Sequence, residues 1–474
     1  MRTLFISFLI IFSLQAALSQ SRIKVFMPGA EHKTAFVWTY TDYISYTKKV
    51  IGYFPVSAKG SIDFKVYAGN LMPVYVQIDF VRINFFIEPG KNYEIRIEKT
   101  DYSKPELFPK SSIGYLSPVF RIVKPEKQDF NKGMKHAAKL FAEFVDSNYL
   151  ALVRGLNTKF LVDSFANVIE TYADSFDNKN LDDYIGFQMA ELRLLNHDYS
   201  EAMVVKQFFD SKKMNLHNPF VMRYFNSFWS NYLVMKGKGY SPFQLDSVIN
   251  REQSYAALSA LLENDPLLKD DTLRELVIIR NIPQMYANRR FDRKALADIL
   301  SDISASKLRK EHQFIATNVR KEMLQRQAGS PAPEFGFIDL AGDSIDLKKY
   351  EGMYVYLNIW DTECPECLAE MEYEKELYED FDDIIAFVSI SVDADTAFMR
   401  QYVKSREFKW QFAHIDTQLK FLYDYRVDVL PRYILINKEG KIEWWNAPAP
   451  SKHFQDMFLK MLNDKKGNLN LEQR

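Results

Sequence analysis

The feature that most constrains the fold of this chain is the number and spacing of its cysteines. The chain has 474 residues and two cysteines, Cys364 and Cys367, with two residues between them. A disulfide between such close neighbours cannot tie distant segments together, so the chain cannot be a disulfide-stapled scaffold. It must instead fold around buried apolar cores, and its length allows about three domains at roughly 150 residues each.

Charge and composition exclude several functional classes. The formal net charge is −1, which creates no overall field that would attract nucleic acid or an anionic membrane, so we expect no nucleic-acid partner. Aromatic residues make up 15% of the chain but are spread along its whole length, which favours core filling over a binding platform.

The first 19 residues have the pattern of a secretory signal peptide. Arg2 precedes an apolar run over 4–14, and Ala17 and Ser19 supply the small residues at positions −3 and −1. The run is shorter than the ~20 residues of a spanning helix, no cysteine near the cleavage site could carry a lipid, and no later stretch is apolar enough to span. We expect cleavage after Ser19 and a soluble periplasmic or otherwise extracytoplasmic protein; the alternative is an uncleaved membrane anchor.

Residues 22–100 are expected to form a small antiparallel β-sandwich. Runs such as Val74–Phe80 and Tyr93–Ile97 alternate between apolar and polar residues, and turn signals separate them. The layout resembles the β-rich N-terminal domain that precedes redox domains in exported Bacteroidetes proteins. Residues 101–125 contain four prolines and are expected to be a linker.

Residues 126–327 change to a helical pattern. Apolar residues recur at helical spacing, for example over 160–172. Thr272 and Glu275 form a capping-box pattern before an apolar run, and Asp292 is placed to cap the following helix. There is no clear repeat period, so we expect a non-repetitive all-α domain that serves as a spacer or binds a partner.

Strands and helices alternate after residue 330, which predicts an α/β domain over 331–465, followed by a polar tail over 466–474. The expected elements are a strand over 353–360, a helix over 365–380, a strand over 384–392, helices over 394–406 and 419–425, a hairpin over 433–445 and a final helix over 452–462. The fold class is therefore multidomain, with an N-terminal β-sandwich, an all-α middle region and a C-terminal α/β domain.

The cysteine pair lies where a strand ends and a helix begins. A helix N-terminus stabilises a thiolate, the nucleophilic form of cysteine, through its free N–H groups and its dipole. Cys364, which we expect to be the more exposed sulfur, would attack a substrate disulfide and form a mixed disulfide. Cys367 would then attack that bond, release the reduced substrate and leave the Cys-x-x-Cys pair oxidised.

Two other interpretations of the pair compete with redox exchange. A zinc site would need further ligands, but there is no other cysteine and the seven histidines show no ligand spacing. A structural disulfide across two residues would be strained and would add little loop-closure stability. Redox exchange is the interpretation that the residues favour, and it requires no metal and no other cofactor.

The residues around the pair are similar to those of a known family. The matching segments are the domain opening at Pro331–Phe335, the strand Val355–Trp360, the cis-proline loop Val429–Pro431 and the terminal hairpin Ile436–Ile442. On these motifs residues 331–462 resemble the thioredoxin-like domain of the TlpA/ResA thiol-disulfide oxidoreductases, within the broader peroxiredoxin and thioredoxin group. The resemblance implies a thioredoxin-like fold for the C-terminal domain.

The resemblance also implies roles for further residues. Pro431 would be cis and face the cysteines, with the Leu430 backbone pairing to an extended substrate segment. Glu370, three residues after Cys367 on the same helix face, would line the cavity and assist proton movement at the thiols; its alternative is an exposed helix glutamate. The substrate-binding surface is expected to include Leu430, Trp360, Pro365 and Glu366.

The chain departs from the family pattern beside the pair. The family usually has Trp before the first cysteine and often Pro two residues after the cavity glutamate, where this chain has Glu363 and Glu372. Glu366 is expected to disfavour the thiolate and to make the pair more reducing, nearer the thioredoxin value of about −270 mV than the DsbA value of about −120 mV. Glu363 gives Cys364 a second negative neighbour, which bears on rate and substrate preference.

We therefore expect an exported thiol-disulfide oxidoreductase that reduces protein disulfides. Its expected partners are a disulfide-bearing exported protein as substrate and a membrane thiol carrier as electron donor. The alternative is an envelope binding or scaffold protein, in which residues 22–327 recognise a partner and the redox module is vestigial. A peroxidase is disfavoured because Leu357 and Asp361 stand where the peroxidase motif has Pro and Thr.

Overall fold

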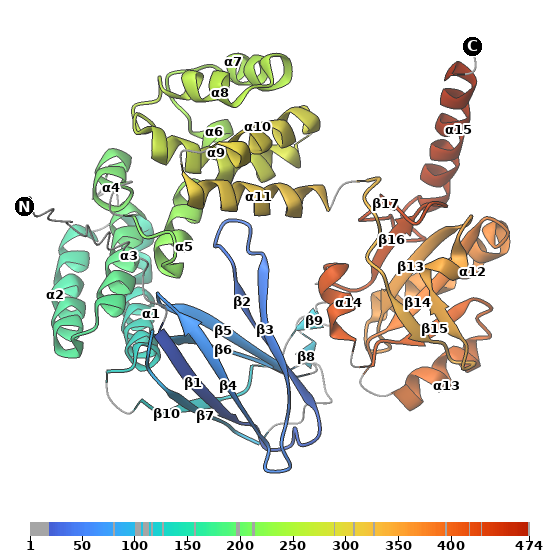
Figure 1. Cartoon of the computed structure of the whole chain (residues 1–474), viewed down its shortest axis with the longest axis horizontal. Helices are drawn as coiled ribbons and strands as arrows, with labels where there is room; N and C mark the ends of the chain where they lie inside the picture. The colour runs from blue at the N-terminus through green and yellow to red at the C-terminus, as the bar shows by residue number, and fades with distance from the viewer. Residues whose placement is uncertain are drawn as a thin grey trace, which may run out of the picture.

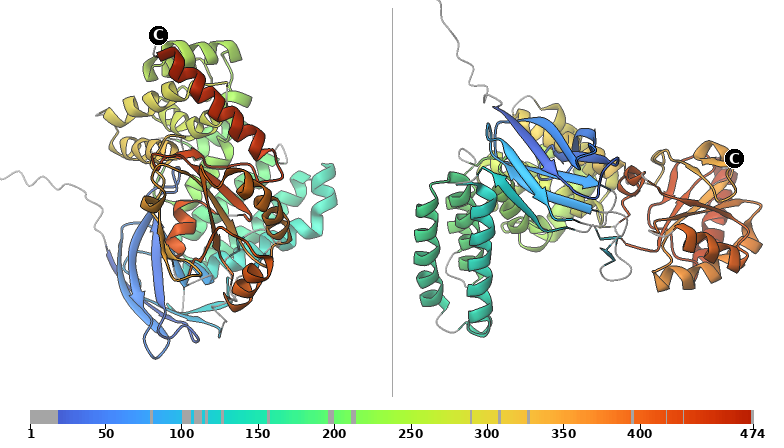
Figure 2. Two further views of the ribbon diagram at one scale, coloured as in Figure 1. Left: turned by 90° about the vertical axis from the view of Figure 1, so that its right-hand side faces the viewer. Right: turned by 90° about the horizontal axis from the view of Figure 1, so that it is seen from below.

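The structure is a computed structural model, and it falls into a β-rich region, a helical region and a C-terminal α/β domain (Figure 1). It describes residues 19–78, 81–99, 106–107, 113–114, 117–125, 128–155, 158–195, 200–210, 214–288, 290–306, 309–325, 328–393, 396–416, 418–427 and 429–472. The expected signal peptide therefore lies outside the described residues apart from Ser19, and so do 101–105, 108–112 and 115–116 of the expected linker. The C-terminal domain stands to one side of the other two regions (Figure 2).

The β-rich region consists of two four-stranded sheets, in the orders β10-β7-β1-β4 and β3-β2-β5-β6. Apolar residues at alternate positions of both sheets, such as Val25 and Phe64 in one and Val37 and Val76 in the other, form one core. The strands are β1 (Ser19–Phe26), β2 (Thr34–Tyr40), β3 (Lys48–Pro55), β4 (Ser61–Ala68), β5 (Met72–Ile78), β6 (Val81–Ile87), β7 (Tyr93–Ile97) and β10 (Phe120–Lys124), with the short pair β8 (Glu106–Leu107) and β9 (Ile113–Gly114).

Two expectations for this region need correction. The arrangement is not purely antiparallel, because β1 pairs with β7 in parallel. The linker prediction over 101–125 is wrong at its end, where β10 adds to the edge of the first sheet and Ile122 lies opposite Ile95. The prolines marked a break in the pattern, but pairing with β7 extends the sheet to these residues.

Every element that the structure describes between residues 128 and 325 is helical, as predicted. The helices are α1 (Phe130–Arg154), α2 (Thr158–Phe176), α3 (Lys179–Leu195), α4 (Glu201–Phe208), α5 (Pro219–Phe228), α6 (Tyr232–Met235), α7 (Pro242–Ser247), a π-helical turn (Val248–Glu252), α8 (Tyr255–Leu262), α9 (Asp271–Tyr286), α10 (Arg293–Ala305) and α11 (Lys310–Leu324). Asp292 caps α10 as expected, accepting from the Ala295 N–H at 2.7 Å.

The capping box predicted at Thr272 is wrong. The cap of α9 is Asp270, whose carboxylate accepts from the Leu273 N–H at 2.7 Å. Glu275 does not reach back to the helix start. It is buried and bonds to the His312 ring at 2.7 Å and to Arg309 at 3.1 Å, which ties α9 to the start of α11.

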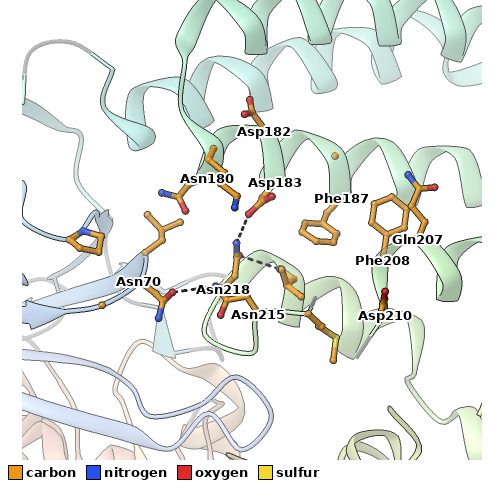
Figure 3. Close-up of a pocket in the computed structure, with 17 residues that line it drawn as sticks. Asn70, Asn180, Asp182, Asp183, Phe187, Gln207, Phe208, Asp210, Asn215 and Asn218 are labelled. Atoms are coloured by element: carbon orange, nitrogen blue, oxygen red, sulfur yellow. Dashed lines mark hydrogen bonds between the residues drawn. The ribbon is translucent and has the colours of Figure 1, made fainter. Parts of the chain in front are cut away.

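The β-rich and helical regions are joined by polar side chains around a shared pocket (Figure 3). Asn215 donates to the Asn70 side chain at 3.2 Å. Asn218 caps α5 and also donates to Asp183 of α3 at 3.1 Å. Leu71 enters the apolar core of α1–α3. These contacts make the two regions one continuous body.

The C-terminal domain has a five-stranded sheet in the order β15-β14-β13-β16-β17. Its elements are β11 (Gly336–Ile338), β12 (Ser344–Asp346), a 3₁₀ turn (Leu347–Tyr350), β13 (Tyr354–Trp360), α12 (Pro365–Phe381), β14 (Ile385–Ser391), α13 (Thr396–Arg406), β15 (Gln411–His414), α14 (Leu419–Asp424), β16 (Arg432–Ile436), β17 (Ile442–Trp444) and α15 (Phe454–Glu472). The strands β13, β14 and β15 run parallel, and β16 and β17 complete the sheet antiparallel.

The predicted alternation of strands and helices is confirmed, with two differences. β15 was not predicted, because its four residues are too short a run to show a pattern. Residues 466–472 belong to α15 and not to a separate polar tail. α12 and α15 cover the face of β13 that carries Tyr354, Tyr356 and Asn358. None of the helices that the structure describes is long and apolar enough to cross a membrane.

Candidate functional site

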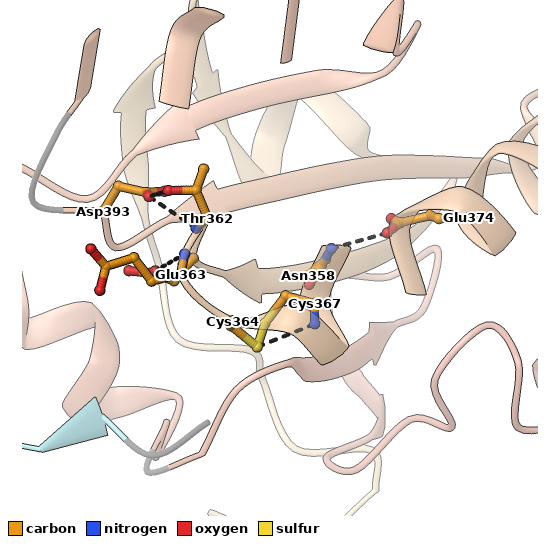
Figure 4. The surroundings of a disulfide bond; sticks show 8 residues. Asn358, Thr362, Glu363, Cys364, Cys367, Glu374 and Asp393 are labelled. Atoms are coloured by element: carbon orange, nitrogen blue, oxygen red, sulfur yellow. Dashed lines mark hydrogen bonds between the residues drawn. A yellow bond between two sulfur atoms is a disulfide. The ribbon is translucent and has the colours of Figure 1, made fainter. Parts of the chain in front are cut away.

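The two cysteines lie at the junction of β13 and α12, and their sulfurs are bonded to each other (Figure 4). β13 is buried along its whole length, which fixes the point from which the chain turns into the helix. Cys364 is the N-cap residue of α12, and its Sγ accepts from the Cys367 N–H at 3.2 Å. The helix N-terminus therefore acts directly on the Cys364 sulfur, as the sequence predicts.

Both cysteines are fully buried, which corrects the expectation that Cys364 is the more exposed. They belong to the apolar core of the domain together with Met371 and Leu430. Trp360 lies in the same core, against Tyr402 and Phe412, so it is not on a substrate-facing surface as predicted. A strand buried on both faces leaves its last side chain no route to the surface.

The Leu430–Pro431 peptide bond is cis, as the family resemblance implies. The sheet register places Arg432 opposite Ile359, so Leu430 and Pro431 lie at the end of β13 from which the cysteine turn starts. Leu430 is buried, whereas Val429 beside it is 53% exposed. Pro365 and Glu366 are exposed as well. Exposed residues thus flank the buried cysteines in the chain and precede the cis-proline bond.

Glu370 is buried, so it is not an exposed helix glutamate. Its carboxylate accepts from the Ser451 N–H at 2.9 Å and from the Ser451 hydroxyl at 2.5 Å. Ser451 lies just before α15, so this contact holds α12, the helix that the cysteines begin, next to the start of α15.

A second buried glutamate, Glu374, was not predicted. It lies seven residues after Cys367, about two turns along the same face of α12, and is fully buried. Its carboxylate accepts from the Asn358 Nδ2 at 2.9 Å (Figure 4). The sequence did place residues 367, 370 and 374 on one face of this helix. Glutamate is almost never fully buried in proteins, however, so Glu374 was not recognised as a buried residue of the site.

Burial raises the pKa of Glu374 to about 8, with the nearby charge of Glu370 adding to the effect. Tyr433 stands opposite Asn358 on β16. Glu374 Oε1, Asn358 Oδ1 and the Tyr433 hydroxyl are buried without a hydrogen-bond partner among the described residues. A carboxyl group in such surroundings is neutral at pH 7 and can give or take a proton near that pH.

Further acidic residues shape the turn before Cys364. Asp361 accepts from the Glu363 N–H at 2.6 Å, and its backbone oxygen accepts from the Cys364 N–H at 3.2 Å. Burial, together with the charge of Asp393, raises the pKa of Asp361 to about 7. Asp393 accepts from the Thr362 N–H at 2.9 Å, and burial raises its pKa too. Two buried carboxyls thus hold the turn in place by hydrogen bonds.

The described residues contain no group of three or more His, Cys, Asp or Glu side chains arranged to hold a metal ion. The groups at this site that can react are the two sulfurs and the buried carboxyls around them.

Comparison with known proteins gives matches to redox proteins. Residues 327–458 match the family model described as Redoxin. The chain is 36% identical over 117 residues to the thiol-disulfide oxidoreductase ResA of a Bacillus cereus strain, covering 24% of this chain and 67% of that protein. It is 33% identical over 115 residues to the thiol-disulfide oxidoreductase ResA of Bacillus subtilis (strain 168), covering 24% and 64%. A crystal structure of the thioredoxin domain of a thiol-disulfide oxidoreductase from Bacteroides vulgatus is 25% identical and covers 28% of this chain and 95% of that chain, with a TM-score of 0.26.

Proposed function

The chain belongs to the ResA-type thiol-disulfide oxidoreductases, and we propose that it is an exported reductase of protein disulfides. The observation that carries the proposal is the Cys364–Cys367 disulfide at the N-terminus of α12, with the cis peptide before Pro431 at the same end of the sheet. One site thus combines a stabilised sulfur, a resolving sulfur and a fixed backbone segment beside them.

The reaction starts from the reduced pair. The Cys364 thiolate attacks one sulfur of the substrate disulfide, so that a mixed disulfide forms and one substrate thiolate leaves. The Cys367 thiolate then attacks the Cys364 sulfur, the internal disulfide forms, and the second substrate thiolate leaves. Two electrons pass from the pair to the substrate. A dithiol donor, which we propose is a membrane thiol carrier, reduces the pair again.

Cys367 must lose its proton before it can attack, and it is fully buried. We propose that the ionised form of Glu374, whose pKa of about 8 lies near the ordinary thiol value of about 8.5, takes up this proton, with its carboxylate held in place by the Asn358 amide. Glu370, bonded to Ser451, is proposed to hold the cavity wall on the same face of α12.

Because both sulfurs are buried, the substrate needs a point of entry. Pro365 and Glu366, which lie between the two cysteines, and Val429, which precedes the cis-proline bond, are exposed. We propose that an extended substrate segment docks there against the backbone of Leu430. Export rests on the pattern of residues 1–19, and it would place the pair among exported disulfide proteins.

Reduction of insulin disulfides, with dithiothreitol as electron donor, tests the proposal. Wild type is expected to accelerate the reaction, and Cys364→Ser and Cys367→Ser are expected to be inactive. Glu374→Gln is expected to keep activity but to shift the pH profile of the rate, whereas Glu379→Gln, at an exposed position of the same helix far from the cysteines, is expected to leave that profile in place. Equal inactivity of wild type and both serine variants across several protein disulfides would support the scaffold alternative instead.

A further inference from the structure

Three parts of the molecule meet at Glu322, in the last turn of α11. Its carboxylate accepts from the Thr47 hydroxyl at 3.2 Å, at the turn between β2 and β3. The same carboxylate pairs with the guanidinium of Arg426, which follows α14 of the C-terminal domain. The side chain of Glu322 is 13% exposed and that of Arg426 is 33% exposed, so the ion pair is largely shielded from solvent.

A second contact links the same parts. Lys48, at the start of β3, places its Nζ 3.7 Å from the centre of the Tyr423 ring in α14 and 4.3 Å from that of Trp38. A lysine held between two aromatic faces is a favourable cation–π arrangement. Tyr423, Arg426 and Glu322 also line one hollow between α11 and α14. Figure 1 shows the β2–β3 hairpin reaching α11, with α14 beside it.

The hairpin is itself fixed to the helical region. Asn318 of α11 donates to the Asp42 carboxylate at 3.0 Å, and Asp42 accepts from the Ser45 N–H at 2.7 Å. The contacts to α14 therefore come from a prearranged surface made jointly by the hairpin and α11.

Arg426 has a left-handed backbone conformation, with a φ of 50°. It stands just after the end of α14, at a position where glycine is commonly found. Two backbone hydrogen bonds close the helix there: the Arg426 N–H donates to the Tyr423 oxygen at 3.1 Å, and the Val427 N–H donates to the Leu422 oxygen at 2.8 Å. An arginine is unfavourable in this conformation for its backbone alone. Its side chain gains the contact with Glu322, which a glycine would lack.

Arg426 stands a few residues before the cis-proline segment (429–431). Val427 and Leu430 are both buried in the core that contains the two cysteines. The position of Arg426 therefore fixes where the chain enters that core. The chain then continues to Leu430 and Pro431, which lie at the end of β13 from which the cysteine turn starts.

We propose that Glu322 and Lys48 are positioning residues for thiol exchange, because they hold α14 and Arg426 and thereby set the cis-proline segment for docking of a protein disulfide. This inference rests on the proposed reductase function. On this inference, the β-rich and helical regions help to set the affinity for a protein disulfide, while the reactivity of the two sulfurs is unchanged.

The test uses the full chain and compares Glu322→Gln with Arg426→Gly. The first keeps the shape of the side chain and removes its charge. The second removes the guanidinium but suits the left-handed backbone, so it is not expected to lower stability. The control is Asp246→Asn, which removes the charge that pairs with Arg290 at 2.5 Å in the helical region; Arg290 is as exposed as Arg426, at 33%, although the Asp246 carboxylate is more exposed than that of Glu322, at 32% against 13%.

Both test variants are expected to raise KM for insulin reduction by roughly two- to fivefold, as loss of a partly shielded ion pair would. Their kcat, the reduction potential of the pair and the KM for oxidised glutathione, a small disulfide, are expected to match wild type. The Asp246→Asn control is expected to match wild type in all of these measurements.

An unchanged insulin KM in both variants would overturn the proposal, as would an equal rise in the control. A changed reduction potential would also overturn it, because the effect would then lie at the sulfurs. If wild type itself did not reduce insulin, the proposed function would fail first, so the two failures are distinguishable.

Discussion

At the scale of single residues, Glu374 departs most from its ordinary chemistry. It is fully buried between α12 and the sheet, where Asn358, Tyr433 and Tyr356 face it from the strands and Glu370 from its own helix. Burial shifts its pKa from the ordinary value of 4.5 to about 8. The folded protein therefore keeps a proton on Glu374 that the unfolded chain releases.

This proton makes stability depend on pH. Between about pH 4.5 and pH 8 the folded state binds more protons at Glu374 than the unfolded state, so its contribution to stability falls as pH rises. Glu374→Gln is expected to remove about 1.4 kcal/mol per pH unit from the slope in this window. Urea unfolding of the oxidised protein across the window measures the slope.

The exposed Glu366 supplies the matched control for this measurement. Glu366→Gln changes an exposed position of the same helix, so its slope is expected to follow wild type. If Glu374→Gln and wild type showed the same slope, Glu374 would not be the neutral buried acid described here.

At the scale of elements, the cap of α9 gives a local test. Asp270 accepts from the Leu273 N–H at 2.7 Å, so Asp270→Ala is expected to lower the free energy of unfolding by about 1 kcal/mol. Thr272→Ala is the control and is expected to lower it less, because Thr272 does not cap the helix. Chemical denaturation measures both. An unchanged free energy of unfolding in Asp270→Ala would contradict the assignment of Asp270 as the cap, whereas any loss in Thr272→Ala reports its hydrogen bond from Arg309 at 3.0 Å.

Most elements of the C-terminal domain were predictable because their patterns are long. The strand before Cys364 is a run of apolar residues, and the helix after it is opened by Pro365 at a position that favours proline. β15 was not predictable because it is four residues long and owes its conformation to pairing with β14. The end of the linker was mispredicted because β10 likewise exists through its partner β7.

The chemistry of the site was predictable only in part. The spacing of Cys364 and Cys367 could be read from the sequence itself, whereas the cis bond at Pro431 was implied only by the family resemblance. The burial of Cys364 and Trp360 depends on how the whole domain closes around them, which no local pattern records. Glu374 was missed for the same reason, since its role depends on Asn358 from another element.

At the scale of the whole molecule, the cores divide the chain into two units. The core around the cysteines contains residues from 332 onward only. The β-rich region has a core of its own, but it is joined to the helical region because Tyr43 packs in the core of the later helices and Leu71 in that of α1–α3. We therefore expect the N-terminal two regions to unfold together and the C-terminal domain to unfold separately.

Core truncations test this division. Leu435→Ala removes a fully buried side chain from the C-terminal core, and Ile279→Ala does so in the helical core. Each is expected to lower the stability of its own unit by roughly 2–5 kcal/mol and to leave the other transition in place. Scanning calorimetry resolves the transitions. A common shift of both transitions by either variant would show a single cooperative unit.

The central claim is that Cys364 attacks a substrate disulfide and Cys367 resolves the product. The most direct measurement is intact-protein mass spectrometry of the reduced Cys367→Ser variant after exposure to insulin. We predict a covalent adduct, carried by Cys364 and released by dithiothreitol, and no adduct with Cys364→Ser. An adduct that formed on Cys367 in Cys364→Ser, or none in either variant, would contradict the account.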